Sequence, residues 1–232
     1  MSDRTEQIYD FLFSVGEGDP CEAIPEEACQ VAPGNALKNV TSGAFSKLAE
    51  QLAHPGLTIP WLLSSLGVPP AITALLLPFK DAGSLGPQLF LAAEIRNRPR
   101  RNRLWAAAAL VQAALLLAMA AALFLLPPLR AGIVVAALFL LFGVSSGVGS
   151  LSFKDTLGKT IPKPRRGTLL GLRASIGGAA ALVAGLILTR LGGADAEPRA
   201  FLYILLIAAG LWVVSGILFR TISEQPGATA GA

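Results

Sequence analysis

Long apolar runs without charged residues decide what this chain can fold into. Three such runs, at 104–126, 131–152 and 200–219, have the length of about 20 residues that a helix needs to cross roughly 30 Å of hydrocarbon. Only 15% of the 232 residues are charged, against about 25% in soluble domains. Because a chain inside a bilayer has to satisfy its backbone polar groups internally, these runs are expected to be helices. The sequence therefore predicts an all-α membrane protein.

Three further segments complete the predicted membrane domain. The run 168–191 is rich in glycine and alanine, which favours close packing against another helix, and Arg173 lies near enough to its start to reach the interface. The segments 35–58 and 69–93 contain charged residues, and in the first the apolar side chains recur near helical spacing. We expect six spans within 35–220. An alternative for 35–58 is a helix that lies in the interface with its charges solvated.

Basic residues gather in two of the loops between these spans. The loop before 104–126 contains five arginines and the loop before 168–191 contains five lysines and arginines, at Arg96, Arg98, Arg100, Arg101, Arg103, Lys154, Lys159, Lys163, Arg165 and Arg166. The loops on the opposite side contain few basic residues. Since positive charge accumulates on the cytoplasmic side, we expect both basic loops and both termini in the cytoplasm. The expected location is a bacterial cytoplasmic (inner) membrane.

The chain outside the six spans is predicted to contribute three short features. Residues 1–34 form an acidic extension, cytosolic in this interpretation, with short helices at 5–15 and 25–31. A short surface helix is predicted at 60–66, after the first span. Residues 221–232 are predicted to be a disordered cytosolic tail.

The sequence contains no constellation of residues that is typical of an enzyme. Cys21 and Cys29 could form a disulfide or contribute to a metal site, but two ligands without a second pair are a weak metal signal. Reduced thiols are therefore the preferred interpretation. With His54 as its single histidine and no Walker-type loop, the chain is expected to have no catalytic residues, metal site or cofactor. The basic loops come without a nucleic-acid-binding motif, so no nucleic-acid partner is expected.

Both basic loops resemble loops of one transporter family. The stretch IPKPRRGTLLGLRASIGG (161–178), which contains Arg165, Arg166, Gly167 and Gly171, resembles the loop between the fourth and fifth helices of the major facilitator superfamily. In AEIRNRPRRNR (93–103), the pair formed by Arg100 and Arg101 fits the basic pair that follows helix two in that superfamily, while Pro99 replaces the usual glycine and the acidic residue is absent or displaced to Glu94. The resemblance covers about 35–220, the six-helix N-terminal half of a twelve-helix fold. It implies two inverted three-helix repeats.

Charged side chains inside the two weaker spans mark the candidate site. A charge at mid-membrane costs at least ~2.5 to 3.5 kcal/mol unless it is paired or hydrated. The functional interpretation is a substrate or coupling cavity lined by Thr41, Ser42, Lys47, Glu50, Lys80 and Asp81. The alternative is a set of internal ion pairs that only hold two helices together. In both cases we predict contact between opposite charges of the first and second spans.

The resemblance implies secondary transport of a small solute by alternating access. In the parent fold the solute crosses between two six-helix halves, so a second half, identical or separately encoded, is the expected partner besides the lipid bilayer. Without it, the polar wall of the cavity would face lipid. The alternative is a non-transporting membrane component or the inactive product of a shortened transporter gene.

Overall fold

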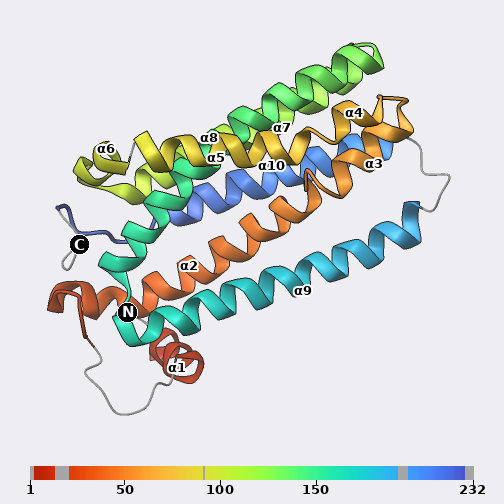
Figure 1. Ribbon diagram of the computed structural model, residues 1–232. Helices are drawn as coiled ribbons and strands as arrows, with labels where there is room; N and C mark the ends of the chain where they lie inside the picture. Colours follow the sequence, from red (N-terminus) through yellow and green to blue (C-terminus); the bar gives the residue numbers. More distant parts are fainter. Residues whose placement is uncertain (1–2, 14–20, 91, 193–197, 228–232) are drawn as a thin grey trace.

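The computed structural model describes residues 3–13, 21–90, 92–192 and 198–227. Within these ranges the chain forms helices and turns and no strand, which confirms the all-α prediction. Six helices of 15 or more residues lie side by side in one bundle (Figure 1): α2 (Glu26–Leu52), α5 (Leu76–Phe90), α7 (Arg101–Leu125), α8 (Pro128–Thr160), α9 (Arg166–Gly192) and α10 (Pro198–Arg220). The short helices α1 (Asp3–Leu12) and α6 (Ala92–Asn97) lie at one end of the bundle, and α3 (Thr58–Ser65) and α4 (Pro70–Thr73) lie at the other.

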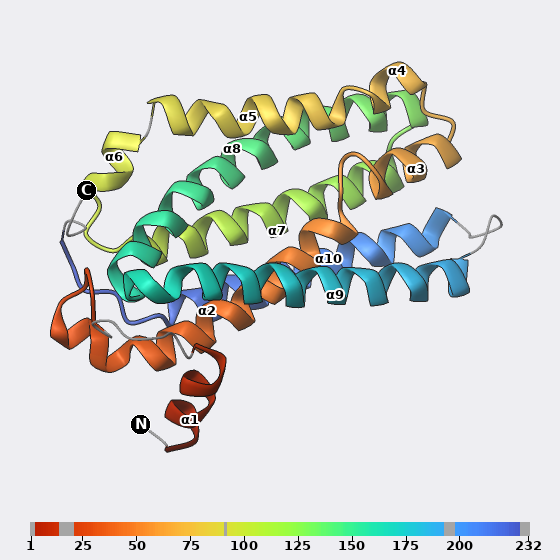
Figure 2. The same ribbon diagram turned by 60° about the horizontal axis from the view of Figure 1, so that its bottom comes forward.

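Two helices form the centres of two packed groups. Helices α5 and α7 both pack along α8, while α9 and α10 both pack along α2, and the contact between α7 and α10 joins the two groups. Helices α2, α7 and α9 run in one direction along the bundle, and α5, α8 and α10 run in the other (Figure 2). As a result, both basic loops lie at the same end of the bundle as the described chain ends.

Four helices are long and apolar enough to cross a membrane, and they indicate a membrane protein. They correspond to Arg101–Leu125, Pro128–Thr160, Lys163–Leu186 and Leu202–Arg220, and each overlaps most of one of the four predicted runs that lack a charged centre. Their outer surface carries exposed apolar side chains that suit contact with lipid, among them Leu117, Phe124, Ile133, Leu182 and Ile207. Four of the six predicted spans are thus confirmed as helices of spanning length and composition.

Helices α2 and α5, the other two predicted spans, differ from those four. The 27 residues of α2 would extend about 40 Å at 1.5 Å per residue, but their composition is more polar. Helix α5 has 15 residues, or about 22 Å, which is short of a bilayer core of roughly 30 Å. The predicted span 69–93 is divided, because α4 ends at Thr73 and α5 begins at Leu76.

The boundary expected after residue 34 lies inside a continuous helix. The predicted short helix 25–31 is wrong, since α2 begins at Glu26 and continues through Pro33. A proline in a helix removes one backbone hydrogen bond and disfavours the preceding turn. Here the fully buried side chains of Ala28, Ala32 and Ala36 pack this part of α2 against its neighbours, and packing outweighs the local preference. The predicted surface helix at 60–66 is confirmed as α3.

The residues that follow α10 pack back onto the bundle instead of forming a disordered tail. The side-chain amide of Asn35 donates to the carbonyl oxygen of Ser223 at 3.0 Å and accepts from the Ser223 amide at 2.9 Å. Glu224 is buried. The expectation of disorder is therefore wrong for 221–227, and the rest of the predicted tail lies outside the described residues.

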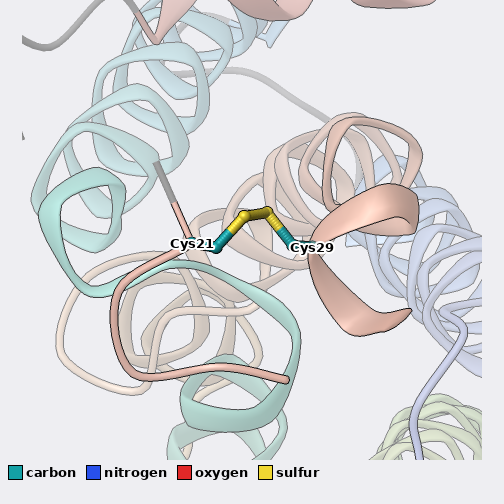
Figure 3. Close-up of a disulfide and its surroundings, with 2 residues drawn as sticks. All are labelled: Cys21 and Cys29. Atoms are coloured by element: carbon teal, nitrogen blue, oxygen red, sulfur yellow. A yellow bond between two sulfur atoms is a disulfide. The ribbon is translucent and has the colours of Figure 1, made fainter. Parts of the chain in front are cut away.

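A disulfide joins Cys21 and Cys29, in place of the two reduced thiols that the sequence favours (Figure 3). The turn at Cys21 leads directly into the first turn of α2, and this brings the two Cα atoms to 5.5 Å from each other, within the usual range for a disulfide. The bridged loop also contacts the segment before α9, where the amide of Lys163 donates to the Glu22 carbonyl oxygen at 3.1 Å.

Helices α5 and α8 approach each other through glycines. A Cβ atom placed on Gly83 would overlap the carbonyl oxygen of Leu140, and one placed on Gly143 would overlap the carbonyl oxygen of Lys80. A backbone carbonyl cannot rotate away as a side chain can. The two helices are therefore in backbone contact, as is common for small residues in membrane helices.

We predict that Gly83→Ala destabilises the protein, although alanine alone favours a helix by up to ~1 kcal/mol over glycine. Overpacking against the Leu140 carbonyl should cost about 1–3 kcal/mol and exceed that gain. The matched control is Gly86→Ala on the same helix, where a Cβ would meet open space and stability should be kept or raised. Thermal unfolding in detergent, followed by circular dichroism, measures both variants. Equal melting temperatures would contradict the backbone contact.

Candidate functional site

Glu50 on α2 forms ion pairs with two lysines. Its Oε2 atom lies 2.9 Å from Nζ of Lys47 on the same helix, and its Oε1 atom lies 3.3 Å from Nζ of Lys80 on α5. The predicted contact between opposite charges of the first two segments is confirmed, with Lys80 and Glu50 as the partners. The side chain of Lys80 is only 14% exposed, so this cation depends on Glu50 for its compensation.

A polar cavity of about 360 Å³ lies between five helices of the bundle. Side chains of α2, α7, α8, α9 and α10 line it, so that parts of the chain far apart in sequence meet there. The lining combines charged and neutral polar groups with aromatic rings, chiefly Ser46, Lys47, Glu50, Trp105, Gln112, Ser146, Ser150, Phe153, Arg173 and Trp212. Charged and polar side chains thus meet in a partly open cavity between helices whose outer surfaces are apolar.

The sequence predicts that Arg173 reaches the membrane interface, but in the structure its side chain turns into the bundle. Its side chain is buried, and Nη1 donates to the carbonyl oxygen and to Oδ1 of Asn39, at 3.1 and 2.8 Å. The guanidinium carbon lies 4.4 Å from the centre of the Phe153 ring. A glycine makes this possible, because a Cβ on Gly43 of α2 would overlap the Arg173 side chain. A second glycine, Gly177, lets α9 approach Lys47 in the same way.

Of the six expected cavity residues, only Lys47 and Glu50 line the cavity. Lys80 contacts it only through Glu50, and the other three lie elsewhere. Thr41 is exposed, and its hydroxyl donates to the carbonyl oxygen of Leu37 in the preceding turn at 2.8 Å. Ser42 is fully buried at the contact with α10, where its Oγ donates to the carbonyl oxygen of Ser215 at 3.0 Å. Asp81 is exposed and has no ion-pair partner within the described part of the chain. Helical spacing predicts a polar side of a helix, but not which neighbour covers it.

The basic pair before α7 has one structural member and one exposed member. Arg101 is fully buried, and its Nε lies 3.3 Å from Oδ2 of Asp155 on α8. Arg100 is exposed at the start of α7. The acidic partner of the pair is thus Asp155, whereas Glu94 forms an exposed ion pair with Arg98 at 3.1 Å.

The second basic loop is fixed by contacts to backbone and to an aromatic ring. Arg166 donates to the carbonyl oxygens of Ile161 and Gly158 at 3.0 and 2.8 Å. The guanidinium carbon of Arg165 lies 4.5 Å from the centre of the Tyr9 ring on α1. Gly167 and Gly171 have open space where a Cβ would lie, so packing does not require glycine at either position.

A second buried ion pair lies at the end of the bundle that carries the basic loops. Nζ of Lys159 is 3.2 Å from Oε1 of Glu224, and the backbone amide of Asn102 donates to Oε2 of the same carboxylate at 2.7 Å. Neither residue of the pair stands inside an apolar run that would have marked it in the sequence. The pair holds the chain after α10 against α7 and α8.

The residues that complete the cavity on α7, α9 and α10 were not predictable as site residues. Gln112 lies in an apolar run as a neutral side chain, and Trp105 and Trp212 are typical of both cores and interfaces. Comparison with protein-family models, curated proteins and solved structures finds no match to the chain. The function therefore has to be inferred from the residues and their contacts.

We predict that Glu50→Gln lowers the free energy of unfolding by about 1–3 kcal/mol, because two lysines lose their charged partner. Asp81→Asn changes the same type of charge next to Lys80 but should stay within about 0.5 kcal/mol of the wild type, as expected for an exposed residue. Glu94→Gln, which breaks an exposed pair, is a second control. Denaturation in detergent compares the three variants. A larger loss for Asp81→Asn than for Glu50→Gln would contradict the assignment of the ion pair.

Proposed function

We propose that the chain is a six-helix half of a transporter of the major facilitator type and that it moves a small solute by alternating access. The observation that carries this proposal is the cavity lined by charged and polar side chains within a bundle of apolar helices. Ionisable residues inside membrane helices are costly and commonly mark the pathway of a substrate or ion. A volume of about 360 Å³ suits a small solute.

We further propose two inverted repeats, α2–α5–α7 and α8–α9–α10, which would make α2 and α5 the remaining two spans. The packing pattern supports this: exchanging α2 with α8, α5 with α9 and α7 with α10 interchanges four of the five major helix contacts in pairs and leaves the α7–α10 contact in place. Exchanged helices also run in opposite directions (Figure 2). Inverted repeats of this kind are common in secondary transporters, whose substrate sites lie near the repeat interface. In such a fold, charge on α2 and α5 is tolerated because it faces a cavity.

A second six-helix half is the proposed partner. Polar side chains remain exposed on the two more polar helices, including Thr41 and Asp81, and the side chain of Lys47 is 49% exposed. If lipid covered these groups, each would lose hydrogen bonds to water without replacement. An identical or separately encoded half that covers this surface would keep them hydrated or paired. We propose that the transporting species contains two halves.

We predict that proteoliposomes take up solute saturably when the reconstituted species contains two six-helix halves. Proteoliposomes that contain only the monomer of 24.0 kDa should show no uptake. Radiolabelled carboxylic acids, phosphate, sugars and amino acids form the test panel. Ser150→Phe should abolish uptake by filling the cavity from α8, whereas Ala137→Phe, on the exposed side of the same helix, should not. Uptake by a monomer would contradict the need for a second half. A folded dimer without uptake would favour a non-transporting component in which the ion pairs only hold the helices together.

The orientation of the bundle is the remaining part of the proposal. We propose that the end with both basic loops faces the cytoplasm, because positive charge is retained on that side. The Cys21–Cys29 disulfide lies at the same end, and disulfides are more typical of oxidising compartments than of the cytosol. The two features point to opposite sides, so accessibility from outside the cell decides between them.

We predict that a cysteine at Asn97 reacts with an impermeant maleimide only after the membrane is opened. Asn97 is exposed at the end of α6, and the experiment uses a chain in which Cys21 and Cys29 are replaced by serine. Leu57→Cys is the matched control, since Leu57 is 68% exposed at the opposite end and should react in intact cells. The reverse labelling pattern would place the disulfide and the basic loops outside the cytoplasm.

A further inference from the structure

We propose that the cavity binds a small oxyanion, a carboxylate or a phosphate, with Arg173 as its main charged partner. This inference rests on the proposed function, because it names the chemical class of the solute. Three observations support it: the net charge of the site, the hydrogen-bond donors that have no partner there, and the side chains that form the walls.

The site has an excess of positive charge. Lys47, Glu50 and Arg173 line the cavity, and Lys80 is held to the carboxylate of Glu50. Three cations and one anion leave a net charge of +2 at a cavity that lies between apolar helices. In such surroundings charges interact much more strongly than in water, so an unbalanced cation is costly and an anion is favoured.

Two groups at the site that can only donate have no partner within the described residues. Arg173 uses Nη1 for Asn39, while its Nη2 has no hydrogen-bond partner within the described residues. The indole Nε1 of Trp212 is buried and has no partner there, and its side chain lines the cavity. An indole nitrogen can only donate, and a guanidinium can only donate. A ligand that satisfies both therefore has to supply acceptor oxygens.

Arg173 is held in a position that suits this role. The two bonds from Nη1 to Asn39 fix the guanidinium, and the ring of Phe153 lies 4.4 Å from its central carbon. A planar guanidinium that is already oriented loses little freedom when it binds an oxyanion, and it can present two parallel N–H groups to one carboxylate or phosphate.

The walls limit the ligand to a small molecule. The rings of Trp105 and Trp212 lie 6.4 Å apart, centre to centre, and both line the cavity. Gln112, Ser146 and Ser150 add neutral groups that can donate or accept. A volume of about 360 Å³ accommodates phosphate or a short carboxylic acid with a few waters, each of which occupies about 30 Å³.

Equilibrium binding to the purified full chain tests the proposal without a transport step. The protein is kept in dodecyl maltoside, which has no phosphate, at an ionic strength held constant with sodium chloride. In a Trp61→Phe background the fluorescence comes from Trp105 and Trp212, which both line the cavity. Succinate and inorganic phosphate are titrated separately, with glycerol as the neutral control. We expect a saturable change for at least one oxyanion and none for glycerol, and the two arms distinguish a carboxylate from a phosphate site.

Arg173→Gln should raise the dissociation constant at least about tenfold, since charged hydrogen bonds contribute about 1.5–3 kcal/mol and tenfold corresponds to 1.4 kcal/mol. Arg103→Gln is the matched control, because Arg103 is exposed outside the cavity and binding should not change. If Arg173→Gln does not fold, Lys47→Gln replaces it as the deciding variant. The side chain of Lys47 is half exposed, and its loss should weaken binding by a smaller factor.

The proposal is overturned if the wild type shows no saturable response to either oxyanion. It is also overturned if the cavity variants bind as tightly as Arg103→Gln does. Binding without uptake in proteoliposomes would keep the oxyanion site and contradict transport. Uptake of a neutral solute without oxyanion binding would keep transport and contradict the site.

Discussion

Polar groups inside an apolar bundle have to find partners on neighbouring helices, and this constraint organises the structure. Ser42 of α2 bonds to Ser215 of α10, and Ser145 of α8 donates to the carbonyl oxygen of Ala108 on α7 at 2.9 Å. Arg173 joins α9 to α2 under the same constraint. Such bonds are worth little individually, but they are directional and therefore select one arrangement of otherwise similar apolar surfaces. The cavity lies where this pairing stays incomplete, so its unpaired donors indicate which ligand the cavity could bind.

Close approach at glycines is the second organising feature, and it occurs in both packed groups. Gly83 and Gly143 bring α5 and α8 into contact, while Gly43 and Gly177 bring α2 and α9 together. A larger side chain at these positions would force the helices apart, and the charged residues beside them could not reach their partners. The glycines thus set the distances that the ion pairs and the Arg173 contact require.

The sequence predicts some parts of this structure well because the relevant signals are local. Length and lack of charge suffice for the four apolar helices. Charge within the weaker spans suffices to expect contact between opposite charges of the two segments, and the structure shows that Glu50 and Lys80 form it. Other features depend on contacts between distant residues. The pairing of Lys159 with Glu224 joins residues 65 positions apart, and the helix through Pro33 is stabilised by tertiary packing. The sequence places Arg173 at the membrane interface, because only the fold shows that Gly43 leaves room for its side chain inside the bundle.

The arrangement of contacts also implies that the bundle is not equally stiff throughout. Helix α8 is packed on two sides by α5 and α7, whereas α9 lies at the edge of the bundle and packs mainly along α2 (Figure 1). Elements with fewer packed neighbours open at a lower free-energy cost. Displacement of α9 would separate Arg173 from Asn39 and widen the cavity from one side, while α5 and α8 moved as one body. Helix α9, which packs along only one long helix, thus carries Arg173, the most buried cation of the cavity.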